Sequence, residues 1–181
     1  MSTKEAILSA LGKVSPPQFG PPSIEYETIR FSDPVGVFRS SLEAAGGETV
    51  DVEGDLEEIV RSSFFHSGEM IDTISGCVTE MPETPSLTIL KAQLGVAENG
   101  AVWIDPADRY PRELLTLSES LAIILSKKTI VHNMHEAYEK ISFENLSYGL
   151  FMSGPSKTAD IEQALVIGAH GAIRLKVFLV E

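Results

Sequence analysis

Hydroxyl and ammonium side chains gather in one turn near the end of the sequence, directly after an apolar run. The turn consists of Ser153, Gly154, Pro155, Ser156, Lys157 and Thr158. Asp160 and Gln163 follow with the spacing of a helix N-terminus, so a helix is expected over residues 161–168. Free backbone N–H groups at a helix start, beside hydroxyls and a lysine, are the parts of an anion site. The pattern therefore predicts an anionic ligand, with a simple helix cap as the alternative. The predicted ligand-binding residues of the turn are Ser153, Gly154, Ser156, Lys157, Thr158 and Asp160.

Two other residues could do chemistry beside such a ligand. His170 stands in the segment GAHGA, where small neighbours such as Gly171 would let a ligand approach the imidazole closely. Glu98 precedes Asn99-Gly100, a pair typical of a tight hairpin turn, and a carboxylate at a strand end can act as base or nucleophile. A structural histidine and a merely exposed glutamate are the alternatives. We treat Glu98 and His170 as candidate catalytic residues and Gly171 as part of the ligand site.

The sequence indicates no metal site and no bound cofactor. His132 and His135 flank a predicted helix start, but two histidines without a third convergent ligand do not predict a metal ion. Cys77 is the only cysteine, which excludes an internal disulfide and a cysteine-held iron–sulfur cluster in this chain. We therefore expect neither a metal nor a cofactor.

The charge balance narrows the range of partners. The chain has 181 residues, with 26 acidic against 14 basic side chains and a net charge of -12. Nucleic-acid binding is not expected, because phosphate contacts need a concentrated basic face. An anionic ligand would need a local positive site, since the global field repels it. No run is long and apolar enough to cross a bilayer, and the first residues are too weakly apolar for a signal peptide, so we expect a cytoplasmic protein.

The apolar pattern predicts the elements that must position these residues. Residues 1–20 predict a short helix and a Pro-rich connector, an arm that packs either on its own body or on a second copy in a homo-oligomer. Residues 21–181 predict a single domain of alternating helices and strands. Apolar runs without alternation predict strands buried on both faces, at residues 86–90, 101–104, 121–125 and 148–152. The expected fold class is α/β, with an open, mainly parallel sheet covered by helices.

This fold would bring three polar loops to one edge. In open α/β sheets, ligands collect outside the carboxyl ends of the strands. The turn at 153–158, His132 and Glu98 each follow a predicted strand. If those strands run parallel, all three loops share one rim. That convergence is the basis for predicting a site.

With these residues placed, the sequence resembles the LUD-domain family, in its lactate utilization protein C group, from about residue 84 onward. The resemblance rests on SGPSKTADIE at 153–162 and GAHGA at 168–172. They are similar to that family's Ser-Gly-Pro-Ser-Arg/Lys-Thr-Ala-Asp-Ile-Glu and Gly-Val-His-Gly-Pro blocks. AENGA at 97–101 stands where many relatives carry Ala-Glu-Thr-Gly-Thr. The chain departs from the family at four of these positions, which are Asn99, Ala101, Ala169 and Ala172.

The resemblance implies a fold and a metabolic setting. The fold is an open α/β sheet of the kind shared by ribose-5-phosphate isomerase, glucosamine-6-phosphate deaminase and CoA transferases. The setting is the oxidation of lactate to pyruvate beside two iron–sulfur partner proteins. CoA transferases of that superfamily also use a glutamate in a Ser-Glu-Asn-Gly turn, and Glu98-Asn99-Gly100 repeats its last three residues. The chain shows no match to their glycine-rich CoA-binding loop.

Three functional hypotheses follow. The first is an accessory or regulatory protein of lactate oxidation that binds an anionic metabolite or nucleotide at the turn. The second is a CoA-transferase-like or other acyl-transfer enzyme that uses Glu98, with Lys157 and His170 stabilising an anionic group. The third is a structural scaffold subunit without a ligand.

Overall fold

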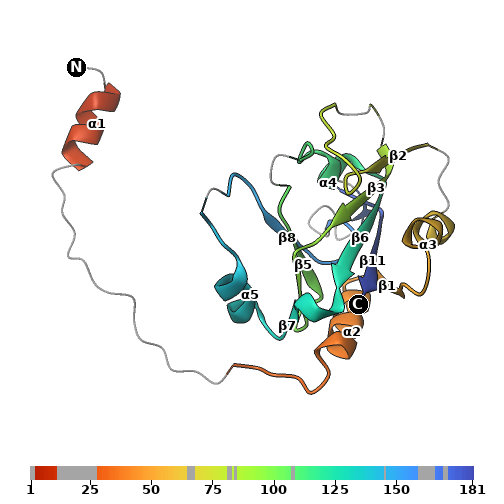
Figure 1. Ribbon diagram of the computed structural model, residues 1–181. Helices are drawn as coiled ribbons and strands as arrows, with labels where there is room; N and C mark the ends of the chain where they lie inside the picture. The colour runs from red at the N-terminus through yellow and green to blue at the C-terminus, as the bar shows by residue number, and fades with distance from the viewer. Residues whose placement is uncertain are drawn as a thin grey trace.

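The computed structural model describes residues 3–11, 28–64, 68–80, 83, 85–106, 109–144, 146–158, 166–168 and 171–181 (Figure 1). Its helices are α1 (Thr3–Leu11), α2 (Pro34–Ala44), α3 (Leu56–Ser63), α4 (Leu114–Leu117), α5 (Met134–Lys140) and the short 3-10 helix η1 (Lys127–Thr129). No helix in this part of the chain is long and apolar enough to traverse a lipid bilayer.

A five-stranded sheet forms the centre of the molecule. Its strands, in spatial order, are β1 (Glu48–Asp51), β11 (Arg174–Val180), β6 (Ser120–Ser126), β3 (Pro85–Lys91) and β2 (Glu69–Asp72). Every neighbouring pair in this sheet is parallel. The predicted α/β class with a mainly parallel sheet is therefore confirmed. Strand β2 was not predicted, because its four residues alternate too briefly to form a recognisable pattern.

Both faces of this sheet are buried, and residues of β6 alternate between two apolar clusters. Leu121, Ile123 and Leu125 pack on the side of α2, in one cluster with Phe38 and Leu42. Ala122 and Ile124 point to the other side, where a second cluster includes residues of α3. The period of two along a strand explains this division, and burial on both sides explains why the strand reads as one continuous apolar run.

A second, four-stranded sheet packs on the α2 side. Its strands, in spatial order, are β7 (Ile130–Val131), β4 (Leu94–Val96), β5 (Ala101–Ile104) and β8 (Leu150–Met152). Strand β5 is buried throughout because Val102 and Ile104 join the α2-side core, whereas Ala101 and Trp103 pack with residues of α5. The run at 101–104 is thus a strand buried on both faces, as predicted, but it pairs antiparallel.

Capping residues fix where two helices begin. The Asp55 carboxylate accepts a hydrogen bond from the Glu58 backbone N–H at 2.9 Å, and α3 follows. Asn133 Oδ1 accepts one from the Glu136 backbone N–H at 3.0 Å, and α5 follows. Each cap satisfies a backbone donor that the helix itself leaves unpaired.

The predicted helix over 161–168 is wrong at its C-terminal end. Val166–Ile167 form strand β10, which pairs antiparallel with β9 (Lys157–Thr158). Gly168 has a φ of 79°, outside the helical region. A short antiparallel ribbon therefore replaces that part of the helix, and residues 159–165 lie outside the described residues.

Candidate functional site

Three of the predicted site loops meet at one edge of the four-stranded sheet. Strands β4 and β8 are both antiparallel to β5, and β7 is parallel to β4, so β4, β7 and β8 run in the same direction. Glu98, His132 and Ser153 follow the carboxyl ends of these three strands. Ser153 Oγ donates a hydrogen bond to the Asn99 carbonyl at 2.8 Å, and the Glu98 N–H donates one to the His132 carbonyl at 3.1 Å. The structure therefore brings these loops side by side.

The Glu98 carboxylate is committed to the start of α5. Its Oε1 accepts a hydrogen bond from the Met134 backbone N–H at 2.7 Å, and the side chain is half-buried. A carboxylate at a helix N-terminus is stabilised by charge-assisted hydrogen bonding and by the positive end of the helix dipole. Glu98 would have to leave this position before it could attack a substrate. The present geometry gives it a structural contact that the sequence did not reveal.

A segment upstream of α2 covers the same rim. The Phe31 backbone N–H donates to His132 Nδ1 at 3.0 Å, and Asn133 Nδ2 donates to the Ile29 carbonyl at 2.9 Å. Arg30 and Glu136 form a salt bridge at 3.2 Å. Because Nδ1 accepts, a neutral His132 carries its proton on Nε2. Sequence reasoning missed this segment, residues 29–31, because its contacts join positions about a hundred residues apart and leave no local pattern.

The turn at 153–158 packs on the C-terminal end of α2. Gly154 has a φ of 72°, and a Cβ placed on it would lie 2.9 Å from the carbonyl carbon of Ala45. A Cβ placed on Gly46 would lie 2.9 Å from Lys157 Nζ, so the Lys157 ammonium lies directly beside Gly46. The C-terminal carbonyls of a helix attract a cation. Lys157 therefore already has a favourable electrostatic setting without a ligand.

The turn also contacts the segment that leads into β11. The Ser156 backbone N–H donates to the Ala172 carbonyl at 2.9 Å, and a Cβ placed on Gly171 would lie 3.0 Å from the Ser156 Cβ. Gly46 precedes β1 and Gly171 precedes β11. The turn thus follows the carboxyl end of β8, but it also lies at the edge of the parallel sheet where β1 and β11 begin. The prediction of one common rim did not include this second edge.

The predicted set is therefore only partly described. Ser156 and Gly171 lie together, Ser153 lies beside Asn99, and Lys157 lies beside the end of α2. Thr158 belongs to β9. Asp160 and His170 lie outside the described residues. Over the residues that the structure places, no group of three or more His, Cys, Asp or Glu side chains could hold a metal ion.

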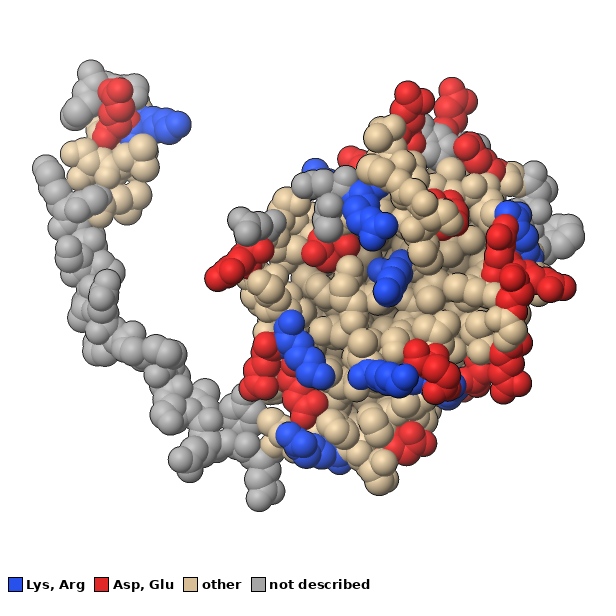
Figure 2. Space-filling model, viewed as in Figure 1, with Lys and Arg blue, Asp and Glu red and all other residues tan. Residues whose placement is uncertain are grey.

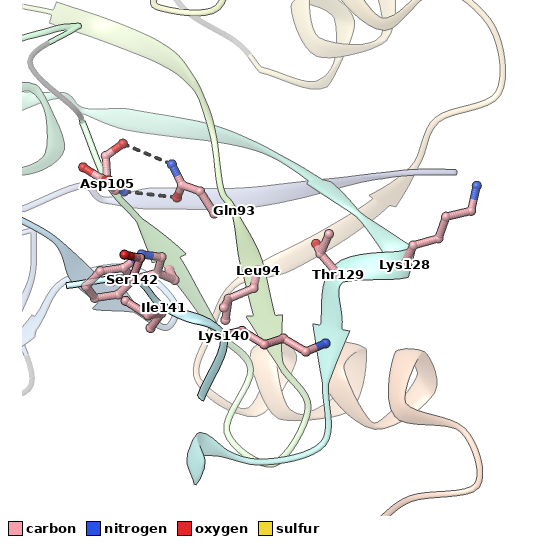
Figure 3. A pocket seen from close by; sticks show the side chains of 9 residues that line it. Gln93, Leu94, Asp105, Lys128, Thr129, Lys140, Ile141 and Ser142 are labelled. Carbon is pink, nitrogen blue, oxygen red and sulfur yellow. Dashed lines mark hydrogen bonds between the residues drawn. The ribbon is translucent and has the colours of Figure 1, made fainter. Parts of the chain in front are cut away.

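A cavity that sequence reasoning missed lies beyond the amino end of β4 (Figure 3). Its volume is about 310 Å³, and its lining includes Gln93, Asp105, Thr129 and Lys140. Gln93 Nε2 donates to the Asp105 carbonyl and Gln93 Oε1 accepts from the Asp105 N–H, both at 3.1 Å. Figure 3 shows the Lys140 ammonium extending toward Thr129, whereas the Lys128 ammonium points away. Sequence reasoning missed this cavity because its lining residue Gln93 is a neutral side chain within an apolar run.

A network of charged side chains occupies the carboxyl ends of β1 and β6. Asp51 contacts both Arg39, at 2.6 Å, and Lys127, at 3.2 Å, and Lys127 also contacts Glu181 at 2.9 Å. The hydrogen bond from Arg39 is the main cause that lowers the pKa of Asp51. The hydrogen bond to Glu181 is the main cause that raises the pKa of Lys127. Each of these charges is paired with an opposite charge, so the Lys127 ammonium already has two carboxylate partners.

Comparison with known proteins identifies a family and several relatives of this chain. A family model described as the LUD domain matches residues 83–180. Lactate utilization protein C 1 of Bacillus mycoides (strain KBAB4) is 37% identical over 101 residues, which cover 52% of this chain and 43% of that protein. Uncharacterized protein YkgG of Escherichia coli (strain K12) is 31% identical over 148 residues, which cover 75% of this chain and 64% of that protein.

Lactate utilization protein C of Bacillus subtilis (strain 168) is 30% identical over 105 residues, which cover 54% of this chain and 43% of that protein. The chain spans roughly half the length of the curated relatives it matches. Among solved structures, a DUF162 family protein from Deinococcus radiodurans aligns with a TM-score of 0.63 at 14% sequence identity, over 85% of this chain and 100% of that one. This last likeness concerns the fold alone.

Proposed function

The chain belongs to the LUD-domain family, and on that premise we propose that it serves in lactate utilization as an accessory protein that binds an anionic metabolite or nucleotide at the turn 153–158. The observation that carries the proposal is the family match over residues 83–180, which includes this turn. The printed names of several relatives support the metabolic setting. A further likeness to the ribose-5-phosphate isomerase and CoA-transferase type of sheet stays a prediction.

The contacts around the turn support a ligand site of modest charge. Lys157 is exposed, so its ammonium can turn from the end of α2 toward a bound anion. A Cβ on Gly154 would meet Ala45, and a Cβ on Gly171 would meet Ser156, so these glycines let the turn pack closely on its neighbouring segments. His170 and Asp160 would complete the predicted set. A bound anion, with its full negative charge, would replace the α2 carbonyls as the electrostatic partner of Lys157.

Iron–sulfur proteins are the partners that the family resemblance implies. Cys77, the only cysteine, is exposed. A cluster held by four cysteines would therefore belong to a partner protein and not to this chain. The chain's part in such an assembly would be to bind the anionic ligand and contact the partner that carries the electrons.

An acyl-transfer enzyme is the second candidate function, and one observation favours it. Glu98, Asn99 and Gly100 form the turn between β4 and β5, and the Asn99 carbonyl of this turn accepts a hydrogen bond from Ser153. Incubation with acyl-CoA esters followed by borohydride should then leave a reduced adduct on Glu98. An unmodified Glu98 peptide with every acyl donor would remove this candidate.

Ligand titration tests the first candidate. A ligand that binds only the folded state raises the melting temperature of the protein. We expect phosphate, a nucleotide or CoA to raise it for the wild type and to do so much less for Lys157→Ala, with Lys4→Ala in the exposed helix α1 as the control. Equal responses of all three proteins would contradict an anion site at the turn. The absence of any rise in all three proteins would support the scaffold hypothesis.

The metabolic role needs a separate test. Some bacterial hosts depend on their own lactate utilization protein C for growth on lactate. When that protein is deleted from such a host, expression of this chain should restore growth on lactate. Purification of the chain from the complemented host should recover iron–sulfur proteins with it. Restored growth without any iron–sulfur partner would contradict the proposed assembly, and failed complementation by a well-expressed chain would contradict the metabolic role.

A further inference from the structure

Four exposed basic side chains gather around two adjoining cavities, away from the turn at 153–158. One ends β3, one follows β5, one belongs to η1 and one ends α5. Figure 2 shows basic side chains near the middle of this view, with acidic side chains mostly around its margin. The four residues, here called the basic band, are Lys91, Arg109, Lys128 and Lys140.

The two cavities connect the members of the basic band. Lys128 and Lys140 line the cavity of about 310 Å³ in Figure 3, and the other two members line a smaller one of about 120 Å³. Gln93 and Asp105 line both cavities. The Gln93 side chain holds the Asp105 backbone by two hydrogen bonds of 3.1 Å, which fixes this shared wall. The four cations therefore belong to one continuous surface.

The basic band is not neutralised by the described part of the chain. Asp105 is the one carboxylate in the described lining of the two cavities, and it already has an interaction of its own. Like charges on one surface repel each other, and an anionic partner relieves that repulsion. The chain as a whole has a net charge of -12, so this local excess of positive charge is exceptional within it. The salt bridges of the described residues all use other cations, which are Arg30, Arg39, Arg61, Lys127, Arg174 and Lys176.

The larger cavity adds an apolar floor to this charged surface. Leu94, Trp103 and Ile141 line it, and each of them is between 5% and 9% exposed. At about 30 Å³ for each water molecule, the cavity volume corresponds to roughly ten waters, which is room for one large apolar side chain. An apolar centre surrounded by a charged, exposed rim is the usual composition of a surface that binds another protein.

The distribution of the cations favours an extended partner over a compact anion. A single phosphate or carboxylate group is held by donors that converge on it. Here the cations come from four separate elements and line two cavities. The Lys128 ammonium points away from the larger cavity, where it can meet a partner that extends past the rim (Figure 3). A second copy of this chain is disfavoured, because two chains that each carry a net charge of -12 repel each other.

We propose that the basic band is the docking surface for an extended acidic segment of a partner protein, with an apolar side chain of that segment in the larger cavity. Carboxylates on one side of the apolar residue contact Lys128 and Lys140, and those on the other side contact Lys91 and Arg109. The basic band contains no residue of the turn at 153–158. The proposal therefore goes beyond the proposed function and does not depend on it.

A synthetic nonapeptide of glutamates with a central phenylalanine tests the chemistry of the surface. Anisotropy of the labelled peptide measures its binding to the full chain, and the fluorescence of Trp103, the only tryptophan, reports entry into the larger cavity. We expect saturable binding that weakens as salt is added. Peptides with glutamine for glutamate, or with a central serine, should bind about tenfold more weakly. Absence of saturable binding, or equal binding of either altered peptide, would overturn the proposal.

Charge-removing variants locate the peptide on the protein. Lys91→Gln and Lys140→Gln, one at each cavity, should each weaken peptide binding about threefold, and the double variant about tenfold. Lys4→Gln in α1 and Lys157→Gln in the turn are matched controls, because each removes the same charge from an exposed position elsewhere. The controls should bind the peptide as the wild type does. Equal weakening by the controls, or unchanged binding by the double variant, would overturn the proposal.

Two further measurements distinguish other occupants of the basic band. Inorganic triphosphate, a compact polyanion, should compete with the peptide only weakly. If it binds more tightly than the peptide and the double variant loses it, the surface holds a small anion and the proposal is overturned. Sedimentation velocity of the full chain at low salt should give the same species for wild type and double variant. A wild-type dimer that the double variant loses would identify a second copy as the occupant and would also overturn the proposal.

Discussion

The turn at 153–158 and the surroundings of Tyr110 differ in how their polar groups are satisfied. At the turn and its rim, Ser153 bonds to Asn99, Glu98 accepts from Met134, and the Ser156 N–H bonds to Ala172. Tyr110 is buried, and its hydroxyl has no hydrogen-bond partner among the described residues. The comparison teaches that a recognisable sequence block can mark a tightly constrained piece of backbone, while a buried polar group without a partner can belong to a residue that no motif singles out.

The largest effect is expected from Gly100→Ala, which tests how rigid the rim is. A Cβ on Gly100 would lie 2.6 Å from the Cα of Leu42, and the residue has a φ of 66°. We expect a loss of about 3 kcal/mol in the free energy of unfolding, measured by urea denaturation. Gly54→Ala is the matched control, because its φ is 116° but no atom lies within 4 Å; it should cost about 1 kcal/mol. Equal losses would show that the α2 contact does not constrain the turn.

Glu98→Ala measures whether the rim glutamate is structural. Removing a charge-assisted hydrogen bond to a helix N-terminus should lower the free energy of unfolding by about 2 kcal/mol. Glu98→Gln keeps an acceptor and should cost about half of that. Urea denaturation of both variants gives the values. An unchanged or increased stability of Glu98→Ala would instead indicate a residue held in readiness for chemistry.

Tyr110→Phe should behave in the opposite way. Because the hydroxyl lacks a partner, its removal should leave the free energy of unfolding unchanged or raise it by up to about 1 kcal/mol in ligand-free protein. Thermal and urea denaturation of ligand-free wild type and variant provide the comparison. A clear loss of stability would mean that the hydroxyl is satisfied within the fold, and the contrast between the two regions would disappear.

The smallest effect concerns pH and the Asp51 network. The pKa of Asp51 is lowered on folding, so its contribution to stability is present above its unfolded pKa and is lost as the pH falls through the lowered folded value. Asp51 is exposed, which keeps the effect small. Asp51→Asn should therefore make the decline in stability below about pH 4 slightly less steep. A steeper decline would contradict the sign.

Much of the fold could be predicted from the sequence, because strand burial and helix caps leave local marks. Ala122 and Ile123 belong to a run whose continuous apolar character indicates a strand covered on both sides. The spacing of Asp55 to Glu58, and of Asn133 to Glu136, predicts where α3 and α5 begin. What could not be predicted is the division into two sheets, since strand pairing is set by contacts between distant residues.

The site shows the same limit. The carboxyl ends of β4, β7 and β8 meet because these strands share a direction, and the sequence could predict that convergence from the order of its loops. The sequence could not predict that Glu98 would accept a hydrogen bond from the Met134 N–H. The two residues are 36 positions apart, and capping residues are recognised only by short spacings. Tyr110 escaped notice for the same reason, because the burial of its hydroxyl without a partner becomes visible only in three dimensions.

The place of β11 in the sheet has a consequence for how the chain folds during synthesis. Strand β11 separates β1 from β6, yet it follows both in the sequence. While the ribosome is still translating the preceding residues, β1 has no strand beside it, and the apolar side chains on both sides of that gap remain in water. Such late, long-range pairing slows folding and leaves a nascent chain open to association with other chains, so a chaperone that shields the β1–α2 region until β11 emerges would favour correct assembly.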